Sequence, residues 1–337
     1  MTAAADAAHD PGWAKAAGRV EALGAGPPIH LPEGEIRVGV ASWTDPTMTR
    51  PGIFYPRGVT GAEERLRHYA DRFPLVEVDA TYYALPRAET AQRWVERTPP
   101  GFVFDLKAHA LMTGQPSEPK RLPPPIREEL PPELAQRPRL YARDLPPAVL
   151  DEVWSTFRRG IEPLRESGKL GVVLLQYPRW VFPSHQAREQ ILESRERLGG
   201  LSVAVEFRHG SWFNQKNAER TLRFLEEHSL PYVVVDEPQG LRSSVPPVVA
   251  ATSPELAVFR FHGRRADAWE RPDVASAERF RYLYDPDQLA DWAPAILAVA
   301  AKVRRTHVVM NNCFANYAVV NATELAGLLR ERVGRSS

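Results

Sequence analysis

Eight short apolar segments, separated by longer stretches with helical periodicity, constrain the fold of this chain more than any other feature. The eight segments are rich in Val, Ile and Phe and comprise Ile36–Ala41, Leu75–Asp79, Phe102–Lys107, Gly171–Gln176, Val203–Phe207, Tyr232–Asp236, Ala257–His262 and His307–Asn312. The stretches between them repeat apolar residues three and four positions apart, as in Gly61–Phe73. Eightfold strand–helix alternation predicts an α/β fold in which parallel strands and crossover helices close into one (β/α)8 TIM barrel.

A doubly wound open sheet is the competing interpretation. That fold usually has a glycine-rich, dinucleotide-binding turn after its first strand. Here the first apolar segment runs into Ser42-Trp43-Thr44 without such a turn, so we favour the barrel and expect no cofactor. The 337 residues suit one barrel with additions, since a TIM barrel needs about 250 residues.

Two regions fall outside this alternation. Residues 1–35, which begin with an Ala- and Gly-rich stretch, are expected to be a disordered tail before a barrel domain at 36–333. Residues 116–147 are rich in proline, with ten prolines between Gln115 and Pro147, and predict an extended excursion because proline blocks helix interiors. We interpret it as a packed surface loop; the alternative is a lid or rim over the barrel mouth.

Composition excludes several classes of protein. The formal net charge is +1, so strong binding to the nucleic-acid backbone is not favoured. The single cysteine, Cys313, cannot form an internal disulfide or a cysteine-rich zinc site, and we expect it to serve packing in a cytoplasmic protein. No stretch approaches the ~18 apolar residues of a membrane span, so no membrane association is expected.

The alternation of side chains along each predicted strand separates apolar from charged residues. In Val203–Phe207 the valines and Phe207 share one face, while Glu206 lies on the other with Arg208. If the apolar face meets the helices, the charged face points into the barrel. Glu77 and Arg260 lie deeper in their strands, and we expect them to form an internal ion pair that fills the barrel.

Polar residues also collect at the carboxyl ends of the strands, where TIM-barrel active sites lie. We expect Glu206 or Asp236 to act as general acid or base with His262 as partner. The predicted ligand-binding residues are Lys107, Arg208, Arg264, Asn311, Asn312, Asp79, Gln176, Trp43, Tyr82 and Trp212. Because Arg264 and the two asparagines follow the seventh and eighth strands, where phosphate sites are frequent, we expect an anionic small-molecule ligand.

Each of these assignments has a structural alternative. Glu206 and Arg208 can neutralise each other, Asp236 can cap a turn, and the aromatic residues can seal the mouth. Three other functions stay open: a metal-dependent hydrolase or isomerase using the carboxylates, a nucleic-acid-binding barrel, and a barrel without catalytic activity. No metal-binding spacing such as H-E-x-x-H is present, so no metal site is assigned.

Several blocks resemble the YecE-like family, a domain of unknown function. They include Val38–Trp43, Val76–Pro86, Leu175–Pro178, Val205–Trp212, Phe259–Arg264 and Asn311-Asn312, in that order between about Ile36 and Leu329. The resemblance implies a TIM barrel and no particular reaction. Asp79 departs from the asparagine usual in the family, and Thr44-Asp45-Pro46 replaces a more aromatic stretch. Both departures lie near the predicted mouth, where they bear on ligand preference.

Overall fold

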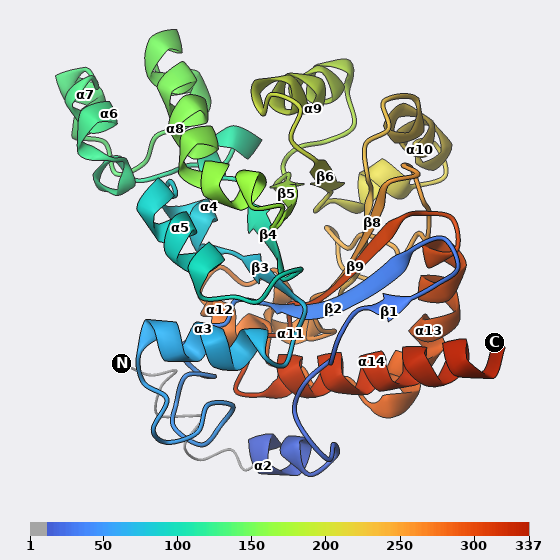
Figure 1. The fold of residues 1–337 in the computed structure, drawn as a ribbon. Helices are drawn as coiled ribbons and strands as arrows, with labels where there is room; N and C mark the ends of the chain where they lie inside the picture. The colour runs from blue at the N-terminus through green and yellow to red at the C-terminus, as the bar shows by residue number, and fades with distance from the viewer. Residues whose placement is uncertain (1–11, 337) are drawn as a thin grey trace.

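A computed structural model describes residues 12–336, and in it eight parallel strands form a nearly closed barrel (Figure 1). The strands are β2 (Glu35–Ala41), β3 (Leu75–Val78), β4 (Val103–Lys107), β5 (Leu170–Gln176), β6 (Val203–Glu206), β7 (Val233–Asp236), β8 (Leu256–Phe261) and β9 (Arg305–Met310). Their order around the barrel is β6-β5-β4-β3-β2-β9-β8-β7. Between β7 and β6 only one parallel bridge, Val205 to Tyr232, closes the circle. The predicted TIM-barrel fold is confirmed.

Helices cover the outside of this barrel and follow most of its strands. The longer ones are α3 (Ala62–Ala70), α5 (Ala88–Glu96), α8 (Pro147–Glu166), α9 (His185–Arg197), α10 (Ala218–Glu227), α13 (Pro286–Ala300) and α14 (Tyr317–Ser336). The short ones are α2 (Gly12–Ala17), α4 (Ala80–Tyr83), α6 (Pro124–Glu128), α7 (Pro132–Ala135), α11 (Ala266–Trp269) and α12 (Ser276–Arg279), with 3-10 turns η1 (Ala110–Thr113), η2 (Pro119–Arg121), η3 (Ala142–Asp144) and η4 (Gly210–Phe213). The alternation is therefore incomplete, because the segment 237–255 between β7 and β8 contains no helix.

The N-terminal segment differs from the expected disordered tail wherever the structure describes it. Residues 12–17 form α2, and Ile29–His30 (β1) pair antiparallel with β2. Arg19 forms an ion pair with Glu324 of α14, with an Nε–Oε1 distance of 2.7 Å. The backbone carbonyl of Trp13 accepts a hydrogen bond from the Asn316 side chain. These polar contacts were not visible from composition. Residues 1–11, the rest of the predicted tail, lie outside the described residues.

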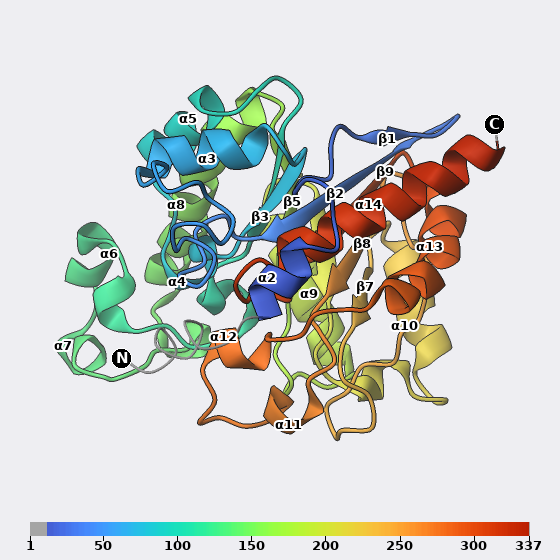
Figure 2. The same ribbon diagram turned by 90° about the horizontal axis from the view of Figure 1, so that it is seen from below.

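The proline-rich segment, which we interpreted as an extended but packed surface loop, contains short helices and buried side chains. Prolines stand in the first turns of α6 and α7, where their missing N–H group costs no hydrogen bond. Ser117 and Leu140 form a β-bridge that closes the base of the segment, and Ile126 and Leu134 are buried. Both helices project to one side of the barrel (Figures 1 and 2).

The interior of the barrel carries the charged face that strand alternation predicted. Arg260 on β8 donates to both carboxylate oxygens of Glu77 on β3, at 2.6 and 2.8 Å. Nearer the amino ends of the strands, His307 Nδ1 of β9 lies 2.9 Å from Asp105 Oδ2 of β4. The internal pair of Glu77 and Arg260 is therefore confirmed. Among the described helices none is long and apolar enough to cross a membrane.

Candidate functional site

A polar cavity of about 350 Å³ opens at the carboxyl ends of the strands. Its ionisable lining consists of six basic residues (Lys107, Arg179, Arg208, Arg260, Arg271 and Arg279) and four acidic residues (Asp45, Glu77, Asp79 and Glu270), besides Tyr82, Tyr83 and Cys313. The segment after β8 that contains α11 and α12 forms one wall, and both helices lie at the end of the barrel away from β1 (Figure 2). Basic residues outnumber acidic ones, which favours an anionic occupant.

The floor of the cavity is a buried charge network. Arg260, which is 1% exposed, contacts Glu206 through Nη1 in addition to its two bonds to Glu77. Burial alone would raise the pKa of Glu206, but Arg260 and the other nearby cationic groups hold it well below its usual range. Glu206 therefore stays ionised, and its carboxylate oxygens accept hydrogen bonds from Arg260 and Arg208. These contacts do not favour the role of general base that we expected for it.

Three guanidinium groups lie close together above this floor. Burial lowers the pKa of Arg279, and the charges of Arg208 and Arg179 lower it further. Within the described residues, neither Arg179 nor Arg279 has a carboxylate oxygen within 4.0 Å; Arg279 donates instead to backbone carbonyls, including that of Arg271 at 2.7 Å. Arg208, by contrast, donates to Glu206 at 3.2 Å, so Arg179 and Arg279 are the two cations whose mutual repulsion an entering anion would relieve. We call Arg179, Arg208 and Arg279 the arginine cluster.

His262 holds one member of this cluster in place. Its Nε2 lies 3.0 Å from Arg208 Nη1 and 3.3 Å from Glu206 Oε1, and its Nδ1 lies 2.8 Å from the Asn311 side-chain amide. Burial, and then the charge of Arg208, lowers the pKa of His262 to about 3. The ring is wholly buried and neutral, and it does not line the cavity. His262 therefore has the geometry of a residue that orients Arg208.

Asp236 and Arg264 pair with each other away from the cavity lining. Arg264 donates to Asp236 through Nε at 2.8 Å and through Nη2 at 2.6 Å, and Trp292 of α13 donates to the same carboxylate at 2.5 Å. The Tyr284 hydroxyl donates a further hydrogen bond to Asp236. Asp236 thus joins the end of β7 to the helix layer. Because neither Asp236 nor Arg264 lines the cavity, these contacts do not favour the roles of acid catalyst and anion-binding residue that we expected for them.

The neighbouring residue, Glu237, was not singled out from the sequence. Its carboxylate is buried, lies 3.7 Å from Arg208, and accepts a hydrogen bond from the backbone N–H of Val245. Burial raises its pKa to about 7, although Arg208 opposes that shift. Arg179 and Arg279 were missed as well. Arg179 follows the Leu175–Pro178 block directly, so the polar end of that loop was the available signal.

Four expected ligand residues do line the cavity beside the network. Lys107 at the end of β4 places its Nζ 4.6 Å from the centroid of the Tyr82 ring, and the Tyr82 hydroxyl donates to Gln115. Asp79 stands at the start of α4, and burial raises its pKa while Lys107 opposes the shift. Gln176 Oε1 lies 3.4 Å from Arg260 Nη1. Strand ends that are distant in sequence therefore converge here as predicted.

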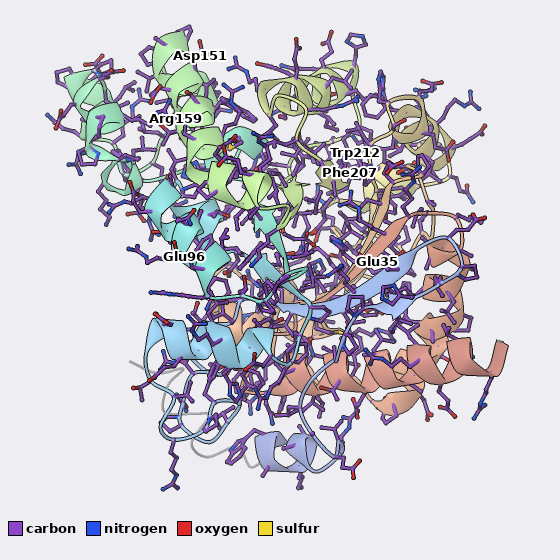
Figure 3. The ribbon with its side chains drawn as sticks, viewed as in Figure 1. Glu35, Glu96, Asp151, Arg159, Phe207 and Trp212 are labelled. Atoms are coloured by element: carbon purple, nitrogen blue, oxygen red, sulfur yellow. The ribbon has the colours of Figure 1, made fainter. Side chains whose placement is uncertain are left out.

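The remaining expected residues divide between the cavity and the core. Asn311 lines the cavity, whereas Asn312 is fully buried and donates to Tyr282 and Asn321. Trp43 packs edge-on against Trp94 at 5.7 Å between ring centroids. Trp212 stacks on Phe207 at 4.1 Å, and both side chains are buried (Figure 3). The two tryptophans therefore contact protein rather than the cavity, as the sealing interpretation requires.

Two kinds of chemistry find little support in the geometry. Among residues 12–336, no group of three or more His, Cys, Asp or Glu side chains is arranged to hold a metal ion. Cys313 donates its S–H to the carbonyl of Ala41, and burial raises the pKa of its thiol well above the ordinary range. A protonated thiol is a poor nucleophile, which agrees with a packing role.

Comparison with known proteins identifies the family. The family model described as a protein of unknown function, DUF72, matches residues 37–336. The chain belongs to the DUF72 family. The YecE-like resemblance is thereby confirmed.

Two sequence relatives and one solved structure resemble this chain over much of its length. UPF0759 protein YunF of Bacillus subtilis is 29% identical over 297 residues, which cover 87% of this chain and 94% of that protein. UPF0759 protein YecE of Escherichia coli is 28% identical over 60% of this chain and 59% of its own length. A crystal structure of a DUF72 family protein from Thermotoga maritima superposes with a TM-score of 0.68 and 28% identity, covering 87% of this chain and 98% of that one. These relatives support the barrel and name no ligand.

Proposed function

We propose that this DUF72 chain is an enzyme that binds a phosphorylated or otherwise anionic small molecule in its barrel mouth. The arginine cluster carries the proposal, because Arg179 and Arg279 face the cavity without a carboxylate partner among the described residues. Guanidinium groups bind phosphate and carboxylate oxygens in pairs of parallel hydrogen bonds. The single cysteine is consistent with a cytoplasmic location.

The neighbouring groups support a ligand held by its anionic end. Arg208 lies over the Trp269 ring at 4.7 Å, and its Nη1 lies 3.0 Å from His262 Nε2. Lys107 and Asp79 stand across the same cavity, so the rest of a bound molecule would meet an amine and a carboxyl group. A mouth with a fixed anion anchor beside ionisable groups is typical of enzymes in this fold.

Thermal unfolding against a ligand panel tests the proposal. The panel contains inorganic phosphate, sulfate and sugar phosphates, with the matching neutral sugars and sodium chloride of equal ionic strength as controls. A ligand present at 100 times its Kd stabilises by about 2.7 kcal/mol, which raises the midpoint by several degrees in a chain of this size. We expect that rise with a phosphorylated compound and not with its neutral counterpart.

Two variants make the test specific to the cavity. Arg179→Gln removes an exposed guanidinium of the arginine cluster, and we expect it to abolish most of the shift. Arg304→Gln removes an equally exposed guanidinium beside Glu255, at the amino ends of the strands, and should leave the shift unchanged. A flat response to every anion up to millimolar concentration, or a shift that survives Arg179→Gln in full, would refute the anion site.

A further inference from the structure

Lys107 stands apart from the other lysines of the chain. The sequence contains six: Lys15, Lys107, Lys120, Lys169, Lys216 and Lys302. Lys169 is also secluded, but its ammonium donates to the carbonyls of Val95 and Thr98 and to the Thr98 hydroxyl, at 2.7–2.9 Å. The other four are exposed. Only Lys107 lines the mouth cavity.

The amine of Lys107, a partly buried residue, lacks the carboxylate partner that usually holds such a lysine in its charged form. In the described part of the chain no carboxylate oxygen lies within 4.0 Å of its Nζ, which lies 4.6 Å from the centroid of the Tyr82 ring. Burial and the charge of Arg260 lower the pKa of Lys107 to about 8, against the opposing effect of more distant carboxylates such as Glu77. At pH 7.5 the neutral fraction is therefore roughly two hundredfold greater than for an ordinary lysine.

We propose that Lys107 is a nucleophilic residue that forms an imine with an aldehyde or ketone group of the anionic ligand. This inference rests on the proposed function, because the arginine cluster supplies the anchor that brings the carbonyl group into the same cavity. The substrate class is thereby narrowed to small carbonyl compounds that carry a phosphate or another anionic group.

The chemistry needs only the amine, the carbonyl compound and proton transfers. The Nζ lone pair forms a bond to the carbonyl carbon, and one proton passes from nitrogen to the former carbonyl oxygen to give a carbinolamine. Protonation of that hydroxyl by an acid lets it leave as water with formation of the C=N double bond, and the remaining N–H proton then returns to the acid, so that one amine and one carbonyl yield one imine and one water. Asp79 lines the cavity with a carboxyl group whose pKa is raised by burial, and it is placed to supply the proton to the leaving hydroxyl.

The charge network beneath Lys107 acts on the product in both directions, because burial and Arg260 oppose a positive charge at this position. An imine of lysine becomes a cation when it is protonated, and the buried carboxylates of Glu77 and Glu206 exert attraction on a charge at this position. The Tyr82 ring beside Nζ offers a face to the same cation. The site therefore holds the amine partly neutral before reaction, and the carboxylates and the Tyr82 ring offset part of the cost of a positive charge on the imine afterwards.

Pyridoxal 5′-phosphate, a phosphorylated aldehyde, is the probe for the test. The full-length protein is incubated with it, imines are reduced with borohydride, and the modified lysines are identified by peptide mass spectrometry. We expect Lys107 to be labelled at least tenfold faster than Lys216 and Lys302, with a rate that rises through about pH 8. Labelling of Lys107 no faster than that of the exposed lysines would overturn the inference.

Variants separate the inference from the function on which it rests. Lys107→Arg keeps the positive charge and Lys107→Met keeps the approximate length, and in neither variant should a lysine be labelled at the fast rate. Lys302→Met is the matched control and should keep the fast labelling of Lys107. If Lys107 reacts equally fast with pyridoxal, which lacks the phosphate, and Arg179→Gln has no effect, the amine is reactive but the anion site is wrong. If the phosphorylated probe raises the unfolding midpoint and Lys107 stays unlabelled, the anion site stands and the imine does not.

Discussion

Replacing Arg260 by Met gives the sharpest test of the charge network at the base of the cavity. Its guanidinium makes two hydrogen bonds to Glu77 and contacts Glu206, and all three side chains are at most 2% exposed. Methionine preserves most of the volume and leaves two carboxylates in the barrel without their shared cation. Breaking one buried ion pair costs about 3–5 kcal/mol, and two carboxylates share this partner. We therefore expect a loss of about 5 kcal/mol in the free energy of unfolding at pH 8.

The loss should depend on pH in a defined direction. Burial already raises the pKa of Glu77 in the wild type, and removal of Arg260 should raise it further and also raise that of Glu206 from its lowered value. An acid whose folded-state pKa is raised binds more protons folded than unfolded, so the variant loses stability as the pH rises above the ordinary glutamate value of about 4.3. The difference between wild type and variant should be small near pH 4 and full at pH 8.

The assay is urea unfolding followed by circular dichroism at pH 5, 6.5 and 8. A loss of 5 kcal/mol corresponds to a fall of about 7 °C in the thermal midpoint, which a parallel melt checks. The triple variant Arg260→Met, Glu77→Gln, Glu206→Gln removes the stranded charges and should regain part of the stability. A loss below about 1 kcal/mol at pH 8, or a loss that does not change with pH, would refute the reasoning.

Three further perturbations have expected outcomes. Burial lowers the pKa of His109 to about 4, so the unfolded chain binds a proton there at a higher pH than the folded chain does. The free energy of unfolding should therefore fall as the pH drops from about 6.5 toward 4. His109→Leu should remove about 2 kcal/mol of that loss between pH 7.5 and pH 5, measured by thermal unfolding. Asp236→Asn should cost about 2–4 kcal/mol and shift the fluorescence of Trp292, which donates to that carboxylate. Gly39→Ala should prevent normal folding, measured as soluble yield, because a Cβ atom there would lie 2.1 Å from the carbonyl oxygen of Leu75.

Two of the three have control variants, and the third has a result that would contradict it. Gly58→Ala is the match for the glycine variant, since a Cβ atom there meets nothing within 4 Å, and its yield should equal that of the wild type. Arg264→Gln removes one partner of Asp236 and should cost less than the loss of the carboxylate itself. An unchanged pH response in His109→Leu would mean that this ring is accessible to protons in the folded state.

Strand positions and the inward charged face followed from the sequence alone, because both depend on local periodicity. All eight predicted segments contain the observed strands or most of their residues, and Glu77 meets Arg260 although 183 positions separate them. Alternation tells which side chains share a face of one strand, and barrel closure brings the faces together. Lys107, Gln176 and Asn311 reach the cavity for the same reason.

What only the tertiary structure decided was the direction of side chains at the end of each strand and beyond it, where partners from other elements and not alternation set the direction. Asp236 turned to the helix layer because Trp292 of α13 and Arg264 offer donors there, and its neighbour Glu237 approaches Arg208 instead. The arginine cluster joins loops after β5, β6 and β8. Its members meet through the path of long loops, which follows from packing between distant segments and leaves no periodic signal in the sequence.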